Sequence, residues 1–175
     1  MSREFQPIGI AVLTVSDTRT LDDDKSGQTL ADRIVGDGHL LNGRAIVKDD
    51  VRAIRAQIRK FVADKNVDAV ITTGGTGLTG RDVTVEAARG LFEKEIEGFG
   101  VIFHMISFQK IKTSTMQSRA TAGIVKGKYV FCLPGSPGAC RDGWDEILRF
   151  QLDYRHMPCN FVEIMPRLSE HLKRK

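Results

Sequence analysis

A glycine-rich segment between an apolar run and a helix-like run constrains this chain more than any other feature. Residues 69–71 are apolar, and after two threonines the sequence continues as GGTG at residues 74–77. A second small turn at residues 79–82 leads into a run with helical character from Val83. Glycines let the backbone approach a ligand closely, and free N–H groups at a helix start attract anions. The segment therefore predicts a buried strand, a phosphate-binding loop and a helix start.

Other interpretations of this loop have less support. A P-loop needs a lysine followed by Ser or Thr after its glycine run, and residues 78–80 (Leu-Thr-Gly) contain no lysine. Gly75, Gly77 and Gly80 fit the GxGxxG spacing, but the acidic residues about twenty positions on do not follow a strand-like run, as a dinucleotide fold requires. A tight turn without a ligand stays open, although the small residues 72–76 are more than such a turn needs.

The length of the chain favours a single domain. Its 175 residues suffice for one α/β domain with a substantial core, and we place that core at about residues 8–161, between loose polar ends that include a solvated basic tail at residues 173–175. No apolar run reaches membrane-spanning length, and the start carries no signal-peptide pattern. We therefore expect a cytoplasmic protein without a membrane partner.

Charge and cysteine usage narrow the classes of ligand. The net charge of +4 favours anionic ligands, but no recognised nucleic-acid-binding motif accompanies it, so we expect no nucleic-acid partner. The three cysteines show no CxxC spacing, and the four histidines are widely separated. A disulfide framework and a structural zinc site are therefore not expected, and the cysteines are expected to pack as small apolar residues.

Alternating strand and helix patterns predict an α/β fold, a three-layer sandwich with a mostly parallel central sheet. Strands are predicted at residues 8–15, 39–47 and 67–73, with a later hairpin at 123–126 and 129–133. Helices are predicted at residues 26–35, 51–62, 83–92, 98–110 and 139–152. We expect residues 113–121 to form a loop and the segment after residue 152 to be extended or looped.

Aspartates and hydroxyl residues surround the predicted helix starts. Residues 22–24 are all aspartate but lack the pattern of a calcium-binding loop, so we expect an exposed loop before a helix capped by Ser26. Leu30, Ile34 and Val35 of that helix are expected to face the core. Either residue 49 or residue 50, both aspartate, is expected to cap the next helix.

One edge of the predicted sheet carries the polar residues. Ser16 and Asp17, the aspartates at 49–50, the glycine loop with Asp82, and the small residues 134–138 all follow strands, and ligands of parallel sheets bind at that edge. Asp49 and Asp82 would repel a phosphate unless a cation lay between them, and Mg²⁺ is bound in this way, through carboxylates and phosphate oxygens. Each aspartate is also placed to be a helix cap, and that alternative stays open.

Together these segments resemble the MoaB/MogA family of molybdenum cofactor biosynthesis proteins, whose domain recurs in gephyrin. The match runs from about residue 8 to 161. The segments that carry it are SDTR at 16–19, TTGGTGLTGRDVT at 72–84, EGFG at 97–100, QSRA at 117–120 and PGSPGA at 134–139. TGGTG followed by RDVT is specific to this family and its close relatives, and the segments SFQKIKTSTMQSRA and CRDGW favour the MoaB type.

The resemblance implies a molybdopterin adenylyltransferase, which transfers AMP from Mg·ATP to the terminal phosphate of molybdopterin and releases pyrophosphate. Asp49 and Asp82 would hold Mg²⁺ and orient the phosphates, with Ser16 and Asp17 on a loop near the site. The residues expected to bind phosphates or substrate are Thr73, Gly74, Gly75, Thr76 and Gly77 in the loop, Ser118 and Arg119 at the pterin phosphate, and Gly135 and Ser136 on the nucleotide side.

The resemblance also implies partners and leaves alternatives. Family members form trimers, MoaB types pair trimers into hexamers, and the apolar segment 101–108 is the candidate contact. The product would pass to a molybdate-inserting partner protein. The alternatives are a catalytically silent homologue that holds molybdopterin or a nucleotide, and a nucleotide pyrophosphatase.

Overall fold

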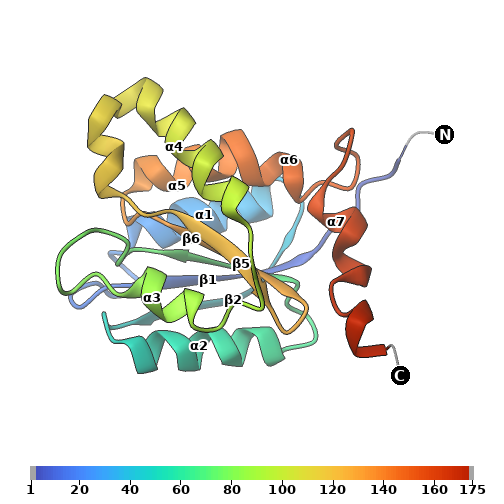
Figure 1. The fold of residues 1–175 in the computed structure, drawn as a ribbon, viewed down its shortest axis with the longest axis horizontal. Coiled ribbons are helices and arrows are strands. Elements are labelled where there is room, and N and C mark those ends of the chain that lie inside the picture. Colours follow the sequence, from blue (N-terminus) through green and yellow to red (C-terminus); the bar gives the residue numbers. More distant parts are fainter. Residues whose placement is uncertain (1–2, 174–175) are drawn as a thin grey trace.

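Six strands form one sheet in the computed structural model, which describes residues 3–173 (Figure 1). The strand order is β2-β1-β3-β6-β5-β4, and the first four strands run parallel, whereas β5 and β4 are antiparallel to their neighbours. The strands are β1 (Gly9–Val15), β2 (Leu40–Val47), β3 (Ala69–Thr73), β4 (Lys94–Glu95), β5 (Thr121–Val125) and β6 (Lys128–Leu133).

Helices cover both faces of the sheet, which confirms the predicted three-layer α/β arrangement. Figure 1 shows α1, α4, α5 and α6 on one side, with α2 and α3 on the other. The helices are α1 (Lys25–Gly36), α2 (Val51–Ala63), α3 (Thr84–Arg89), α4 (Glu97–Ile111), α5 (Pro137–Gly143), α6 (Arg149–Gln151) and α7 (Phe161–Ile164). A single π-helical turn, Trp144–Leu148, joins α5 to α6, so residues 137–151 form one irregular helix.

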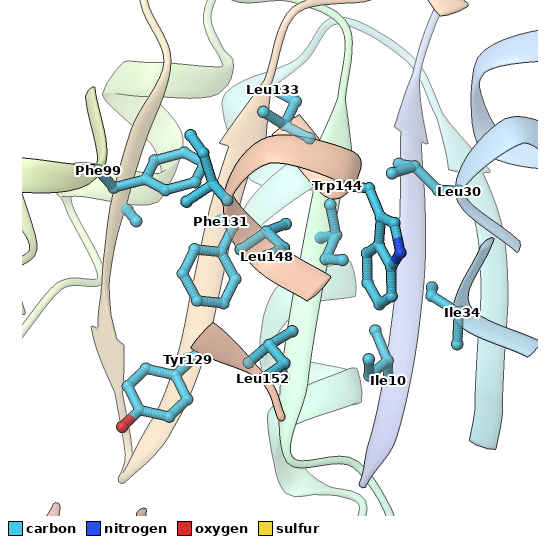
Figure 2. Close-up of a cluster of buried hydrophobic side chains, with 14 of the residues drawn as sticks. Ile10, Leu30, Ile34, Phe99, Tyr129, Phe131, Leu133, Trp144, Leu148 and Leu152 are labelled. Carbon is cyan, nitrogen blue, oxygen red and sulfur yellow. The ribbon is translucent and has the colours of Figure 1, made fainter. Parts of the chain in front are cut away.

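Alternation along the strands builds one hydrophobic core on each side of the sheet. Every residue of β1 is buried, because both faces of a mostly parallel sheet are covered by helices. Ile10 and Val12 face the larger core, whereas Ala11 and Leu13 face the core beneath α2 and α3. Figure 2 shows the larger core, where the fully buried Trp144 packs between strands and α1.

The start of α1 differs from its prediction. Asp24, not Ser26, caps the helix, and its Oδ1 accepts a hydrogen bond of 2.9 Å from the N–H of Gly27. Asp24 is also buried, and its Oδ2 accepts a hydrogen bond from the Thr14 hydroxyl at 2.6 Å and pairs with Arg44 at 3.3 Å, which offsets the cost of burying a carboxylate. The expectation of an exposed loop is therefore wrong for this aspartate.

Other local predictions need correction. Val35 was expected to face the core but is 58% exposed, and Cys159 is exposed, whereas Cys132 and Cys140 are buried as expected. The helix predicted to end at residue 92 ends at Arg89, and the two-residue edge strand β4 follows it. The segments expected to be loops contain helical turns: the 3-10 turns Lys112–Gln117, Met165–Arg167 and Glu170–Lys173, and helix α7.

The parallel strands place four connections at one edge of the sheet. The carboxyl ends of β2, β1, β3 and β6 are neighbours there, and the segments that follow them begin at residues 48, 16, 74 and 134. Within residues 3–173, no helix is long and apolar enough to cross a membrane. Of the basic tail, residues 174–175 lie outside the described residues.

Candidate functional site

The loop after β3 adopts a backbone that only glycine tolerates. Gly74 and Gly75 have φ angles of +98° and +65°, in the left-handed region that favours glycine. A Cβ at Gly75 would lie 2.8 Å from Oδ1 of Asp49 and would collide with the hydroxyl of Thr84. A Cβ at Gly74 would collide with the carbonyl oxygen of Val15. Close approach to β1 and to Asp49 therefore explains the paired glycines.

The carbonyl oxygens of this loop accept hydrogen bonds from the protein, whereas two of its N–H groups have no acceptor among the described residues. Thr84 and Arg119 donate to all of its carbonyl oxygens: Thr84 Oγ1 to Gly74 at 2.8 Å, Thr84 N–H to Gly75 at 2.9 Å, Arg119 N–H to Thr76 at 3.1 Å, and Arg119 Nε to Gly77 at 2.9 Å. By contrast, the N–H groups of Gly75 and Thr76 have no acceptor anywhere in residues 3–173. Consecutive free amides of this kind form a concave site for an anion.

Asp49 follows β2 and lies against the glycine loop. No donor within the described chain reaches its carboxylate, and its own N–H donates to Asp17 Oδ1 at 3.2 Å. Burial, followed by the charges of Asp17 and Asp82, raises the pKa of the Asp49 carboxyl. Asp50 takes the capping role, accepting from the N–H of Ala53 at 2.8 Å. Asp49 is therefore a half-buried carboxylate without a structural partner.

Asp82 lies on the other side of the same loop. Its Oδ2 accepts from the N–H of Thr79 at 2.9 Å and from the Thr79 hydroxyl at 2.6 Å, and a Cβ at Gly77 would lie 2.7 Å from it. The Thr79 hydroxyl, followed by the N–H groups of Thr79 and Gly77, lowers the pKa of the Asp82 carboxyl. The N-cap residue of α3 is Val83, so Asp82 is not a helix cap.

Asp17 connects three of the edge loops. Its carboxylate pairs with Arg81 and accepts from the N–H of Asp49, and Arg81 lowers the pKa of the Asp17 carboxyl. The adjacent hydroxyl of Ser16 accepts from the N–H of Arg19 at 3.2 Å and so stabilises the turn after β1. Ser16 and Asp17 thus shape the loop near the site, and Arg81 neutralises one of its carboxylates.

The carboxylates beside the loop are suited to binding a divalent cation together with phosphate oxygens of a ligand. Across residues 3–173, no three His, Cys, Asp or Glu side chains come together as a metal site of their own. Asp49 and Asp82, however, both lie against the glycine loop, and burial, followed by the charges of Asp17 and Asp82, raises the pKa of the Asp49 carboxyl. Mg²⁺ is commonly held by one or two carboxylates together with phosphate oxygens and water. Asp49 and Asp82 therefore fit Mg²⁺ once a phosphate occupies the loop.

The remaining predicted residues form a second group beside the loop. Ser118 and Ser136 line one cavity of about 340 Å³, between α4 and the start of α5, and Lys110 and Arg141 also line it. The hydroxyl of Ser136 caps α5 through the N–H of Ala139 at 3.1 Å. The structure thus brings together two serines that are far apart in the sequence and adds two basic residues that the sequence did not indicate.

Gly135 and Thr73 join the two groups. A Cβ at Gly135 would lie 3.1 Å from the Cα of Gly74, so the loop after β6 packs directly on the glycine loop. The buried Thr73 donates its hydroxyl to the carbonyl of Pro134 at 3.0 Å. That hydroxyl therefore connects two strand ends and is already used within the protein.

A smaller polar cavity of about 160 Å³ also lies at this edge. Ser16, Thr73 and Gly135 line it, and so do residues that sequence reasoning missed: Thr14, Val15, Arg19, Asp24 and Ser26. Ser26 donates its hydroxyl to the carbonyl of Gly135 at 2.7 Å. The only sequence signal for this group was the run of hydroxyl and acidic residues after the first strand.

Comparison with known proteins identifies the family of this chain. Residues 11–154 match the family model described as a probable molybdopterin binding domain. Over 161 residues the chain is 49% identical to molybdenum cofactor biosynthesis protein B of Escherichia coli (strain K12), covering 92% of this chain and 95% of that protein. The chain belongs to the molybdenum cofactor biosynthesis family. The predicted resemblance is therefore confirmed.

Solved structures of this family share the fold. A crystal structure of a molybdenum cofactor biosynthesis protein B superposes with a TM-score of 0.82 at 37% identity, covering 99% of this chain and 100% of that chain. The tungsten cofactor synthesizing protein MoaB from Pyrococcus furiosus gives a TM-score of 0.74 at 34% identity, covering 82% and 91%. The mostly parallel sheet with helices on both faces is thus the architecture of the MoaB/MogA family.

Asp49 and its neighbour Asp50 should respond to alanine in opposite directions. Asp49→Ala should raise the unfolding temperature in metal-free buffer near pH 7, because it removes a carboxylate whose pKa is raised in the folded protein. That gain should shrink as the pH falls through the folded-state pKa, where the wild-type carboxyl becomes neutral. Asp50→Ala should cost about 1 kcal/mol, because it removes the cap of α2. A loss of stability in Asp49→Ala would contradict the assignment of Asp49 as a residue without a structural role.

Proposed function

We propose that this protein adenylylates molybdopterin, joining AMP from Mg·ATP to the terminal phosphate of the pterin and releasing pyrophosphate. The observation that carries the proposal is the loop at residues 74–77, which keeps the N–H groups of Gly75 and Thr76 free beside the unpartnered carboxylate of Asp49. Membership of a molybdopterin-binding family supplies the substrate class.

The residues act by binding and orienting two phosphate groups. The amides of Gly75 and Thr76 would bind phosphate oxygens, and Asp49 and Asp82 are the residues that would hold Mg²⁺. When bound, Mg²⁺ neutralises phosphate charge and polarises the phosphoryl group that is attacked. Positioning and charge neutralisation supply most of the rate in phosphoryl-type transfers, so no covalent nucleophile is required.

The cavity beside the loop offers space for the rest of a substrate. Ser118 and Ser136 supply hydroxyls there, and Arg141 supplies positive charge suited to an anionic ligand, whereas Lys110 pairs with Asp142 of the same cavity. The volume of about 340 Å³ lies within the range typical of small-molecule sites. We assign Ser118 to the pterin phosphate side and Ser136, with Gly135, to the nucleotide side.

One assay separates this proposal from its alternatives. Purified protein with Mg·ATP and molybdopterin should release pyrophosphate and form adenylylated molybdopterin, and Asp82→Asn should slow both strongly while leaving the circular dichroism spectrum unchanged. Loss of an active-site carboxylate should cost about a hundredfold or more in rate, because it removes charge stabilisation at the transferring group. Asp22→Asn, a matched change at an exposed aspartate, should retain full activity.

Each alternative outcome has its own signature. Tight molybdopterin binding without pyrophosphate release would identify a catalytically silent binding homologue. Cleavage of a dinucleotide in the absence of molybdopterin would identify a nucleotide pyrophosphatase. Undiminished turnover in Asp82→Asn would remove the role assigned to that carboxylate.

We also propose that α4 joins copies of this chain into a homo-oligomer. Five apolar residues of this helix, Val101, Ile102, Met105, Phe108 and Ile111, are 45–64% exposed, although the same helix buries Phe99 and Phe103 against the core. Large exposed apolar patches mark protein interfaces more often than solvated surface. The trimers and paired trimers typical of this family make a second copy the expected occupant, and the molybdate-inserting protein remains a further partner.

A charge placed on this helix should separate the copies. Met105→Glu should shift the sedimentation coefficient to that of a smaller species, because it would bury a carboxylate in an apolar contact. Met157→Glu makes the same change at an exposed methionine away from α4 and should leave the assembly intact. Sedimentation velocity measures both, and an unchanged assembly in Met105→Glu would exclude α4 as the contact.

A further inference from the structure

The guanidinium of Arg119 is occupied by the protein itself. Its Nε donates to the carbonyl oxygens of Thr76 at 3.2 Å and Gly77 at 2.9 Å, and its Nη2 donates to the carbonyl of Asp82 at 3.1 Å. The remaining donors face the carboxylate of Glu86, with Nη2 at 3.2 Å from Oε2. Every nitrogen of this side chain therefore has a partner in the glycine loop or in α3.

Glu86 holds the guanidinium from the opposite side. It lies on α3, one helical turn after Asp82, and it pairs with Arg119 through both carboxylate oxygens. The hydrogen bond from Arg119 lowers the pKa of the Glu86 carboxyl, so the ion pair persists at neutral pH. A bidentate pair fixes the plane of the guanidinium and thereby the direction of its other donors.

We propose that Arg119, held by Glu86, is a positioning residue that fixes the glycine loop and Asp82, and that its guanidinium does not bind substrate. The inference rests on the proposed function, because positioning the loop contributes to catalysis only if the site carries out that reaction. It replaces the role at the pterin phosphate that the family resemblance implies for Arg119. It also assigns Glu86, which no sequence motif indicated, to the support of the site.

The charges explain why the site needs such a residue. A carbonyl oxygen that faced the ligand would repel a phosphate, and Arg119 holds those of Thr76 and Gly77 away from it. The same guanidinium reaches the backbone of Asp82, so it connects the two ends of the segment 76–82. A lysine could supply the positive charge, but its three donors share one nitrogen and cannot reach acceptors on opposite sides as the planar guanidinium does.

Two conservative variants test this arrangement without relying on the reaction. In Glu86→Gln and Arg119→Lys, the amides of Thr79, Asp82 and Thr84, whose hydrogen bonds hold the loop, should exchange with solvent deuterium about tenfold faster. The affinity for Mg·pyrophosphate should fall by a similar factor. Glu95→Gln makes the matched change in the exposed Arg89–Glu95 pair and should alter neither quantity.

The outcomes separate positioning from substrate binding and from general stability. Positioning predicts that kcat falls in both variants while the KM for molybdopterin stays unchanged. Normal exchange and normal Mg·pyrophosphate affinity in Glu86→Gln would overturn the proposal, as would a rise confined to the KM for molybdopterin in Arg119→Lys. If the amides of the central strand β1 exchanged faster by the same factor as the loop amides, the variants would have lost stability throughout the protein. That result would indicate a general structural role and would also overturn the proposal. Because exchange and pyrophosphate binding need no turnover, failure of the proposed reaction leaves this test intact.

Discussion

The carbonyl oxygens of residues 74–77 point into the protein, where Thr84 and Arg119 donate hydrogen bonds to them, and the other features of the site depend on this arrangement. A peptide group that turns its carbonyl inward turns its N–H outward, so Gly75 and Thr76 present free amides at the sheet edge. The positive φ angles of Gly74 and Gly75 make this orientation accessible. The site is thus formed by the loop backbone, and the short helix α3 supports it through its first residue, Thr84.

Two of the three aspartates around the loop have ion-pair or hydrogen-bond partners within the protein, and the third has no donor within residues 3–173. Asp17 pairs with Arg81, and Asp82 accepts hydrogen bonds from Thr79. Asp49 alone among these three lacks a donor within residues 3–173 and lies beside the charges of the other two. Such a carboxylate costs stability in the absence of a ligand, and proteins retain groups of this kind where function needs them. A cation bound together with a phosphate would remove this cost.

The local sequence pattern was enough to predict the strands and the sheet edge that carries the site, but not the contacts between side chains. The apolar runs that form β1 and β3 are recognisable from sequence, and the rule that parallel strands end at one edge brings their loops together. The choice of Asp24 over Ser26 as the cap of α1 depends on Thr14 and Arg44, which reach it from two strands. Likewise, Arg119 donates mostly to backbone carbonyls. Every residue carries such a group, so the residue types could not indicate these partners. The cavity shared by Ser118 and Ser136 arises only when α4 and α5 pack together.

An NMR titration of ¹⁵N-labelled protein with pyrophosphate, with and without Mg²⁺, tests whether the glycine loop binds phosphate together with a cation. Free amides beside an unpartnered carboxylate predict that the signals of Gly75 and Thr76 shift most, and that they shift strongly only when Mg²⁺ is present. Saturating shifts centred elsewhere would contradict this account, for example around the cavity of about 580 Å³ near Lys94 and His171. Equal binding without Mg²⁺ would also contradict it.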